Sequence, residues 1–106
     1  MPTTKGSLTS KTGTDIVAVF TLYGTQYKYS ANGRPNPGKY GPLTATLTYD
    51  SIDQLTGSHG YTGQTGTRKV VVRIGNGPRI EADLGDEQYN FDPASTTEGN
   101  GTWTSA

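Results

Sequence analysis

The stretch Leu43-Thr44-Ala45-Thr46-Leu47-Thr48-Tyr49 alternates strictly between apolar residues and threonine. Successive side chains of a β-strand point to opposite faces of the sheet, so this period of two predicts a strand with one buried face. The residues expected on the buried face are Leu43, Ala45, Leu47 and Tyr49.

Further strands are indicated on both sides of this segment. Residues 15–23 form a near-continuous apolar run, which favours a central strand or one covered on both faces. Residues 70–74 and 80–84 carry the other two clear strand patterns. Weaker strand patterns cover 26–31 and 55–62, and short pieces lie near 89–91 and 102–104. No segment sustains the apolar spacing of an amphipathic helix, so we expect almost no helix.

The hairpin between residues 70–74 and 80–84 has two competing registers. A two-residue Asn76-Gly77 turn is favoured locally, but it would set Ile74 opposite Arg79 on one face. Burial should decide the register, because a one-residue slip moves a strand's apolar side chains to the other face. We therefore predict a longer loop. Its expected pairs are Ile74 with Ile80, Val72 with Ala82, Val70 with Leu84 and Arg73 with Glu81.

Six to eight short strands separated by turns are typical of an antiparallel β-sandwich or a small β-barrel, and the pattern does not choose between them. The 106 residues suit one domain. We expect that domain to span residues 13–106. Residues 1–12 are rich in Thr, Ser, Lys and Gly and are expected to form a flexible N-terminal arm.

The residue inventory offers little for catalysis or for metal binding. There is no cysteine, so a disulfide, a thiolate metal site and a cysteine nucleophile are all excluded. His59 is the only histidine, and we expect it to be an ordinary strand residue. We therefore predict that the chain is not an enzyme and that it binds no cofactor. Calcium stays open as an alternative, because residues 85–92 hold three carboxylates and two side-chain amides, without the EF-hand spacing.

Carbohydrate recognition suits the side chains expected in loops. Aromatic faces can stack on sugar rings, and Asn, Asp and Arg can hydrogen-bond sugar hydroxyls. The long 32–42 connection and the acidic 85–92 turn are the expected binding loops. We therefore predict a non-catalytic, lectin-like binding module. Its candidate ligand-binding residues are Arg34, Asn36, Tyr40, Tyr89, Asn90, Asp92 and Trp103.

The alternative is a structural or protein–protein interaction subunit that acts by self-association. Charge asymmetry supports it, because residues 1–39 carry a net +4 and residues 79–98 a net −5. Nucleic acid is a less favoured partner, because nine basic residues are balanced by nine acidic ones. No apolar run is long enough to span a membrane or to form a signal peptide. The sequence as written thus predicts a cytoplasmic location, with export by another route left open.

Overall fold

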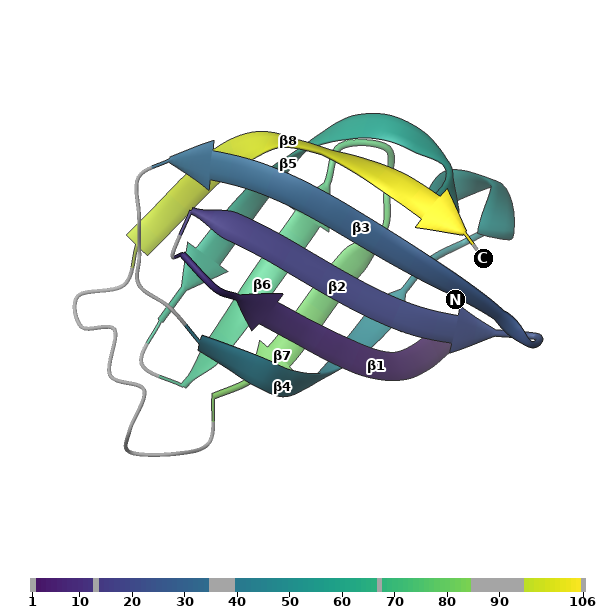
Figure 1. Ribbon diagram of the computed structural model, residues 1–106, viewed down its shortest axis with the longest axis horizontal. Coiled ribbons are helices and arrows are strands. Elements are labelled where there is room, and N and C mark those ends of the chain that lie inside the picture. Colours follow the sequence, from purple (N-terminus) through teal and green to yellow (C-terminus); the bar gives the residue numbers. More distant parts are fainter. Residues whose placement is uncertain (1, 13, 35–39, 67, 85–94, 106) are drawn as a thin grey trace.

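The computed structural model describes residues 2–12, 14–34, 40–66, 68–84 and 95–105. These residues form antiparallel strands and one short 3₁₀ helix (Figure 1). In chain order the elements are β1 (Thr3–Ser10), β2 (Asp15–Leu22), β3 (Thr25–Arg34), β4 (Tyr40–Thr48), η1 (Ile52–Leu55), β5 (Gly57–Thr65), β6 (Lys69–Ile74), β7 (Arg79–Asp83) and β8 (Ser95–Ser105). The expected all-β class is confirmed.

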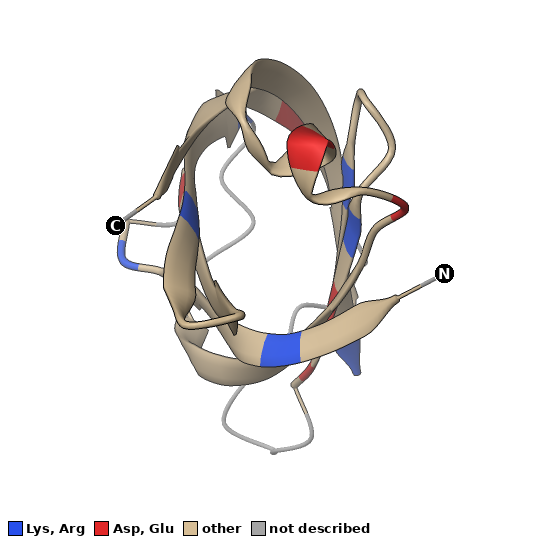
Figure 2. Ribbon diagram, turned by 90° about the vertical axis from the view of Figure 1, so that its right-hand side faces the viewer, with Lys and Arg blue, Asp and Glu red and all other residues tan. Residues whose placement is uncertain are grey.

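The eight strands close into a barrel, which decides between the two architectures left open by the sequence. Their order around the wall is β1-β2-β3-β8-β5-β6-β7-β4, and β4 returns to pair with β1. Viewed from one end, the strands form a complete ring (Figure 2). Every neighbouring pair is antiparallel. Closure leaves no unpaired sheet edge among the described strands.

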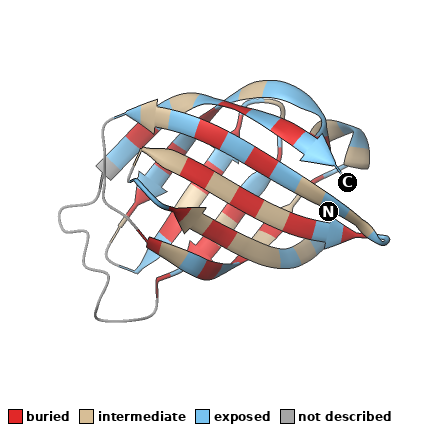
Figure 3. Ribbon diagram, in the orientation of Figure 1, coloured by how far each residue is buried: buried red, intermediate tan, exposed pale blue. Residues whose placement is uncertain are grey.

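Burial alternates along the strands as the threonine-rich segment predicted (Figure 3). The inward side chains of β4 and the residue after it are at most 7% exposed. The apolar run of β2 is only half covered, because its outward Val17 and Val19 remain partly exposed. Of the two expected alternatives, coverage on both faces is therefore wrong, whereas β2 does have a neighbouring strand on each side, β1 and β3. In a single-walled barrel, each strand has one face turned to the interior.

The segment expected to be a flexible arm forms β1 instead. Thr3–Ser10 is hydrogen-bonded to β2 on one side and to β4 on the other. Leu8 is fully buried, with Ala18 and Leu43 as its cross-strand partners. Composition suggested mobility because the outward positions are polar. Backbone pairing on both sides and the inward-facing Leu8 hold β1 in place.

The β6–β7 hairpin has a shorter loop than predicted. Val72 pairs with Ile80, and the Ile74 N–H donates to the Pro78 carbonyl at 2.9 Å, so only three residues form the loop. This register differs from the expected one by two residues, which keeps the same faces inward. Glu81 consequently lies opposite Val71, and its ion pair is with Arg79 of the same strand.

Contacts with η1 hold this shorter loop. The Asn76 side chain donates to the Gln54 carbonyl at 2.9 Å, and the Gln54 side chain donates to the Asn76 carbonyl at 3.0 Å. Gly77 has a φ of 125°, a conformation that side chains other than glycine rarely adopt. The loop conformation thus depends on a helix 22 residues away in sequence, which a local turn preference does not reveal.

η1 closes one end of the barrel, which we call the closed end. Its Leu55 is 1% exposed and joins the core. A capping box starts the helix, with reciprocal hydrogen bonds between Ser51 and Gln54. This helix lies in the connection from β4 to β5 at that end of the barrel.

Large aromatic rings stand over glycines inside the barrel. A Cβ built on Gly101 would lie 2.6 Å from Cζ of Tyr29, and one built on Gly6 would lie 2.6 Å from Cδ1 of Phe20. Rings therefore occupy the space that the glycine side chains would need. Alternation of large and small residues is how narrow barrels fill their interiors.

Gly101→Ala tests this packing. The added methyl group would also lie 2.8 Å from the Ser30 carbonyl oxygen, so the backbone would have to move. We expect the free energy of unfolding to fall by about 1–3 kcal/mol. Urea denaturation would measure the change. An unchanged stability would show that the ring of Tyr29 is not held against this glycine.

Tyr23→Asn tests the β2–β3 turn. Tyr23 has a φ of 51° and is 88% exposed, so its ring gains little burial to offset its left-handed backbone. Asparagine adopts this conformation more readily. We expect the variant to be more stable by about 1 kcal/mol, which raises the Tm by about 4 °C for a domain of this size. Differential scanning calorimetry would measure it, and a lower Tm would contradict the prediction.

Candidate functional site

The barrel has two unlike ends. Opposite the closed end lies a second end, on the left in Figure 1, which we call the loop end. There β3 finishes at Arg34, β4 begins at Tyr40 and β8 begins at Ser95. Because β3 and β8 are neighbours in the wall, the described residues that border the two expected binding loops lie at the same end.

The three described candidate residues occupy different environments. Arg34 is exposed at the end of β3. Tyr40 is 5% exposed and Trp103 is 4% exposed, and both rings belong to the core. Trp103 packs against Tyr29, with ring centroids 5.1 Å apart. The remaining candidates, Asn36, Tyr89, Asn90 and Asp92, lie outside the described residues, as does the possible calcium segment at 85–92.

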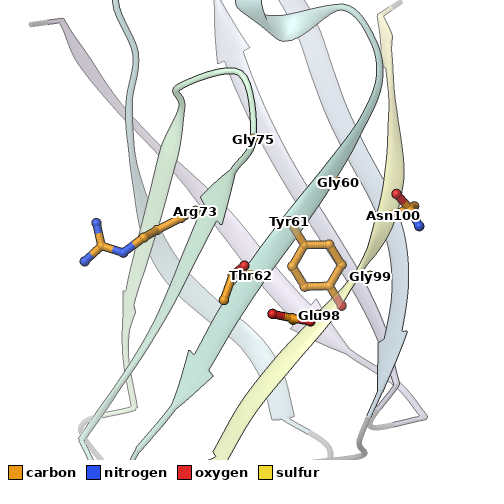
Figure 4. Close-up of a pocket in the computed structure, with 8 residues that line it drawn as sticks. All are labelled: Gly60, Tyr61, Thr62, Arg73, Gly75, Glu98, Gly99 and Asn100. Atoms are coloured by element: carbon orange, nitrogen blue, oxygen red, sulfur yellow. The ribbon is translucent and has the colours of Figure 1, made fainter.

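The outer wall carries a hollow of about 520 Å³ over β5, β6 and β8, which we call the outer hollow (Figure 4). Gly60 forms part of its floor, with Arg73 on one side and Asn100 on the other. The described residues that line it are Gly60, Tyr61, Thr62, Arg73, Gly75, Glu98, Gly99 and Asn100. The hollow exists because glycines replace side chains between polar neighbours.

A row of polar side chains crosses the wall at this hollow. Thr62 of β5 pairs with Arg73 of β6 and with Glu98 of β8, and Glu98 pairs with Arg34 of β3. All four residues are exposed. Within the described part of the chain, the only ion pair is that of Arg79 with Glu81. The charged groups of Arg34, Arg73 and Glu98 are therefore available to a ligand.

Sequence reasoning missed the outer hollow because its residues come from three strands. The local signal is the run Glu98-Gly99-Asn100-Gly101, in which polar residues alternate with glycine. That pattern places Glu98 and Asn100 on one face of a strand. It does not show that β5, with a glycine opposite Asn100, lies beside them.

The interior becomes polar toward the loop end. Asp15 Oδ1 accepts hydrogen bonds from the Thr12 N–H at 2.8 Å, the Thr12 hydroxyl at 3.0 Å and the Ser10 hydroxyl at 3.3 Å. Burial acts to raise the pKa of Asp15, but hydrogen bonds, chiefly from Thr12, hold it below its usual range. Asp15 is thus ionised at neutral pH.

Three buried tyrosines share this interior. Burial, with a smaller repulsion from Tyr61, raises the pKa of Tyr29 to about 12. Burial also raises the pKa of Tyr40 well above its usual value, and repulsion from Tyr61 and Asp15 adds to the shift. The pKa of Tyr61 is raised by burial and by the charge of Asp15. All three are neutral hydrogen-bonding groups at physiological pH.

The described residues offer neither a catalytic histidine arrangement nor a metal centre. Nε2 of His59 lies 2.8 Å from the Thr56 carbonyl oxygen, a contact within its own turn. Within the described ranges, no three His, Cys, Asp or Glu side chains gather as metal ligands would. No described helix has the length and apolar character needed to cross a bilayer.

Comparison with known proteins found no match to a family model, to a curated protein or to a solved structure. The candidate site is therefore argued from its own geometry.

Because burial raises the pKa of Tyr29, we expect the free energy of unfolding to fall at high pH. The unfolded chain loses tyrosine protons near pH 10, whereas the folded protein holds that of Tyr29 up to about pH 12. The contribution of Tyr29 to stability should therefore be constant below about pH 10 and fall as the pH rises from 10 to 12. Absorbance at 295 nm should show that tyrosine ionisation in the folded protein continues up to about pH 12. Complete tyrosine ionisation of the folded protein near pH 10 would contradict this prediction.

Proposed function

We propose that this chain is a non-catalytic carbohydrate-binding module, with the outer hollow and the adjoining Arg34 as its binding surface. The observation that carries the proposal is a glycine floor bordered by charged and amide side chains that have no described ion-pair partner. A volume of about 520 Å³ falls within the usual range for ligand pockets, about 300–1,000 Å³.

The chemistry of the lining suits a hydroxylated ring. The flat backbone at Gly60 and Gly99 lets the C–H face of a sugar approach closely. The Glu98 carboxylate accepts hydrogen bonds from hydroxyls, while Arg73 donates to hydroxyl oxygens. Asn100 does both. An apolar ligand would leave these groups desolvated without partners, at a cost in binding free energy.

The interior of the barrel supports placing the ligand outside. Aromatic rings and aliphatic side chains fill the core between the two ends. Eight strands enclose a space just wide enough for side chains, or for one small ligand where the core is left open. The proposed surface therefore lies on the wall rather than within the barrel.

The candidate loop residues remain part of this proposal. Arg34 ends β3 beside Glu98 of β8, and Ser95 begins β8. Residues Asn36, Tyr89, Asn90 and Asp92 follow or precede these two strands in sequence. We propose that they extend the binding surface from the outer hollow.

A hydrolytic role receives little support from the same residues. Glycoside hydrolysis generally requires a pair of carboxyl groups across the scissile bond. Among the described residues that line the outer hollow, Glu98 is the only carboxylate. Binding without chemistry is the simpler role for this surface.

Self-association remains the alternative function, but one route to it loses support. An unpaired sheet edge can bind the edge of a second copy. The described strands close on themselves and present no such edge. A second copy could not dock by strand pairing with these described strands and would need side-chain contacts instead.

A glycan array with wild-type protein first identifies a glycan that binds. Calorimetry with that glycan then compares wild-type protein with the Gly60→Ala and Glu98→Gln variants. A Cβ at Gly60 meets its nearest atom at 3.4 Å, so the methyl group enters the hollow without a severe clash. Glu98→Gln removes the charge while keeping the shape. We expect each variant to weaken binding at least tenfold.

Lys5→Ala and Arg73→Ala form a matched pair for this experiment. Each removes one exposed positive charge, but Lys5 lies on β1, across the barrel from β5. Arg73→Ala should weaken binding, and Lys5→Ala should not. An array without binding to folded wild-type protein would refute the proposal. Among the candidate residues at the loop end, Arg34→Ala is suitable for the same binding measurement. Tyr40 is not substituted, because a change at this buried residue would disturb the core.

A further inference from the structure

A second, smaller cavity lies inside the barrel at the loop end. Its volume is about 10 Å³, and we call it the inner cavity. Its polar lining includes Ser10, Asp15, Tyr40, Tyr61, Thr65 and Thr97. The described linings of the inner cavity and the outer hollow share only Tyr61, whose ring points inward. A volume of about 10–15 Å³ is the space needed to hold one water molecule.

Tyr61 contributes a buried hydroxyl that lacks a hydrogen-bond partner among the described residues. The residue is 4% exposed. Its ring points inward, since a Cβ built on Gly33 of β3, on the far side of β8, would collide with its Oη. Tyr29, the neighbouring ring, donates its hydroxyl to the His59 carbonyl at 2.8 Å. Buried hydroxyls normally have such a partner, because leaving one unpaired is costly.

The charges around the inner cavity repel an anion and do not require a cation. An anion would face the ionised Asp15, and the described lining contains no basic side chain. A cation is not required, because Asp15 Oδ1 already accepts three hydrogen bonds from Ser10 and Thr12. An apolar group would leave Tyr61 unpaired. A neutral hydroxyl can both donate and accept, and it fits the size.

We propose that the inner cavity binds one neutral hydroxyl-bearing group, which hydrogen-bonds to Oη of Tyr61. Water or the hydroxyl of a small polyol supplies this group. The proposal is independent of carbohydrate binding at the outer hollow, since the two sites lie on opposite faces of the barrel wall. Either can fail while the other holds.

Gly63→Ala tests occupancy by filling the space. Gly63 lines the inner cavity, and its added Cβ would lie 3.5 Å from Cε2 of Tyr61 and 3.9 Å from the Thr97 carbonyl oxygen. These are ordinary contacts, so the methyl group itself causes no clash. Displacing a bound hydroxyl would leave Tyr61 unpaired and should lower the Tm. An empty cavity would instead be filled, and the Tm should rise.

Gly60→Ala is the matched control, because Gly60 lies on the same strand and faces outward. It reports the effect of replacing a strand glycine without touching the interior. The proposal expects Gly63→Ala to have a lower Tm than Gly60→Ala. The reverse order contradicts it.

Tyr61→Phe and Tyr29→Phe provide a second comparison, because each removes one buried hydroxyl. Tyr29→Phe breaks a hydrogen bond that the structure contains, so it should lower the Tm. If the inner cavity is occupied, Tyr61→Phe lowers the Tm as well. If the Tyr61 hydroxyl has no partner, its removal raises the Tm.

Wild-type protein gives the deciding measurement should a variant fail to fold. NMR exchange spectroscopy should detect a long-lived water with cross-peaks to protons of Tyr61. Repeating the NMR experiment with glycerol distinguishes water from a polyol hydroxyl as the occupant. Loss of the cross-peaks identifies a polyol hydroxyl as a competing occupant. Persistence of the cross-peaks identifies water alone. Absence of a long-lived water in the glycerol-free sample overturns the proposal.

Discussion

The rest of this structure depends on close contact between aromatic rings and glycine backbone inside the barrel. Tyr29 stands over Gly101 and Phe20 over Gly6, at distances where any side chain on the glycine would collide. These contacts fill a narrow interior with few residues. They allow a chain with only 30% hydrophobic residues to build a continuous core. The arrangement of polar groups on the wall follows from this packing.

Glycine has a different consequence on each face of the wall. Facing inward, as at Gly101, it makes room for a ring from another strand. Facing outward, as at Gly60, it leaves a hollow between the side chains of neighbouring strands. The outer hollow and the filled core thus share one physical cause. This is why the proposed binding surface lies on β5 and β8, the strands in which glycine recurs most often.

The sequence predicts the local features of this fold well. Alternation in residues 43–49 identifies both the strand and its buried face, and the four clear patterns all become strands. Features that depend on distant partners are not predictable in this way. β1 has too little apolar content to be recognised, and its order comes from pairing with β2 and β4. The β6–β7 loop follows its contacts with Gln54 rather than its own turn preference.

Some features of the candidate site can likewise be predicted from the sequence, and others depend on distant partners. Arg34 could be identified because it borders an unusual proline-rich connection, and it does lie beside the outer hollow. Tyr40 and Trp103 were chosen because aromatic residues near turns suit sugar binding, yet the core uses both rings. Residue type alone does not distinguish a stacking surface from core packing. Strand register makes that distinction, and the order of the strands is needed to know it.

The position of β8 between β3 and β5 constrains how the protein is made. These two neighbours are distant in sequence from residues 95–105, and both lack one hydrogen-bonding partner until that segment arrives. A chain emerging from the ribosome therefore exposes two open strand edges until residues 95–105 have emerged. The barrel closes only when β8 pairs with β3 and β5, which are distant from it in sequence. Pairing over such sequence separations makes folding slow, and the open edges leave the incomplete chain prone to aggregation.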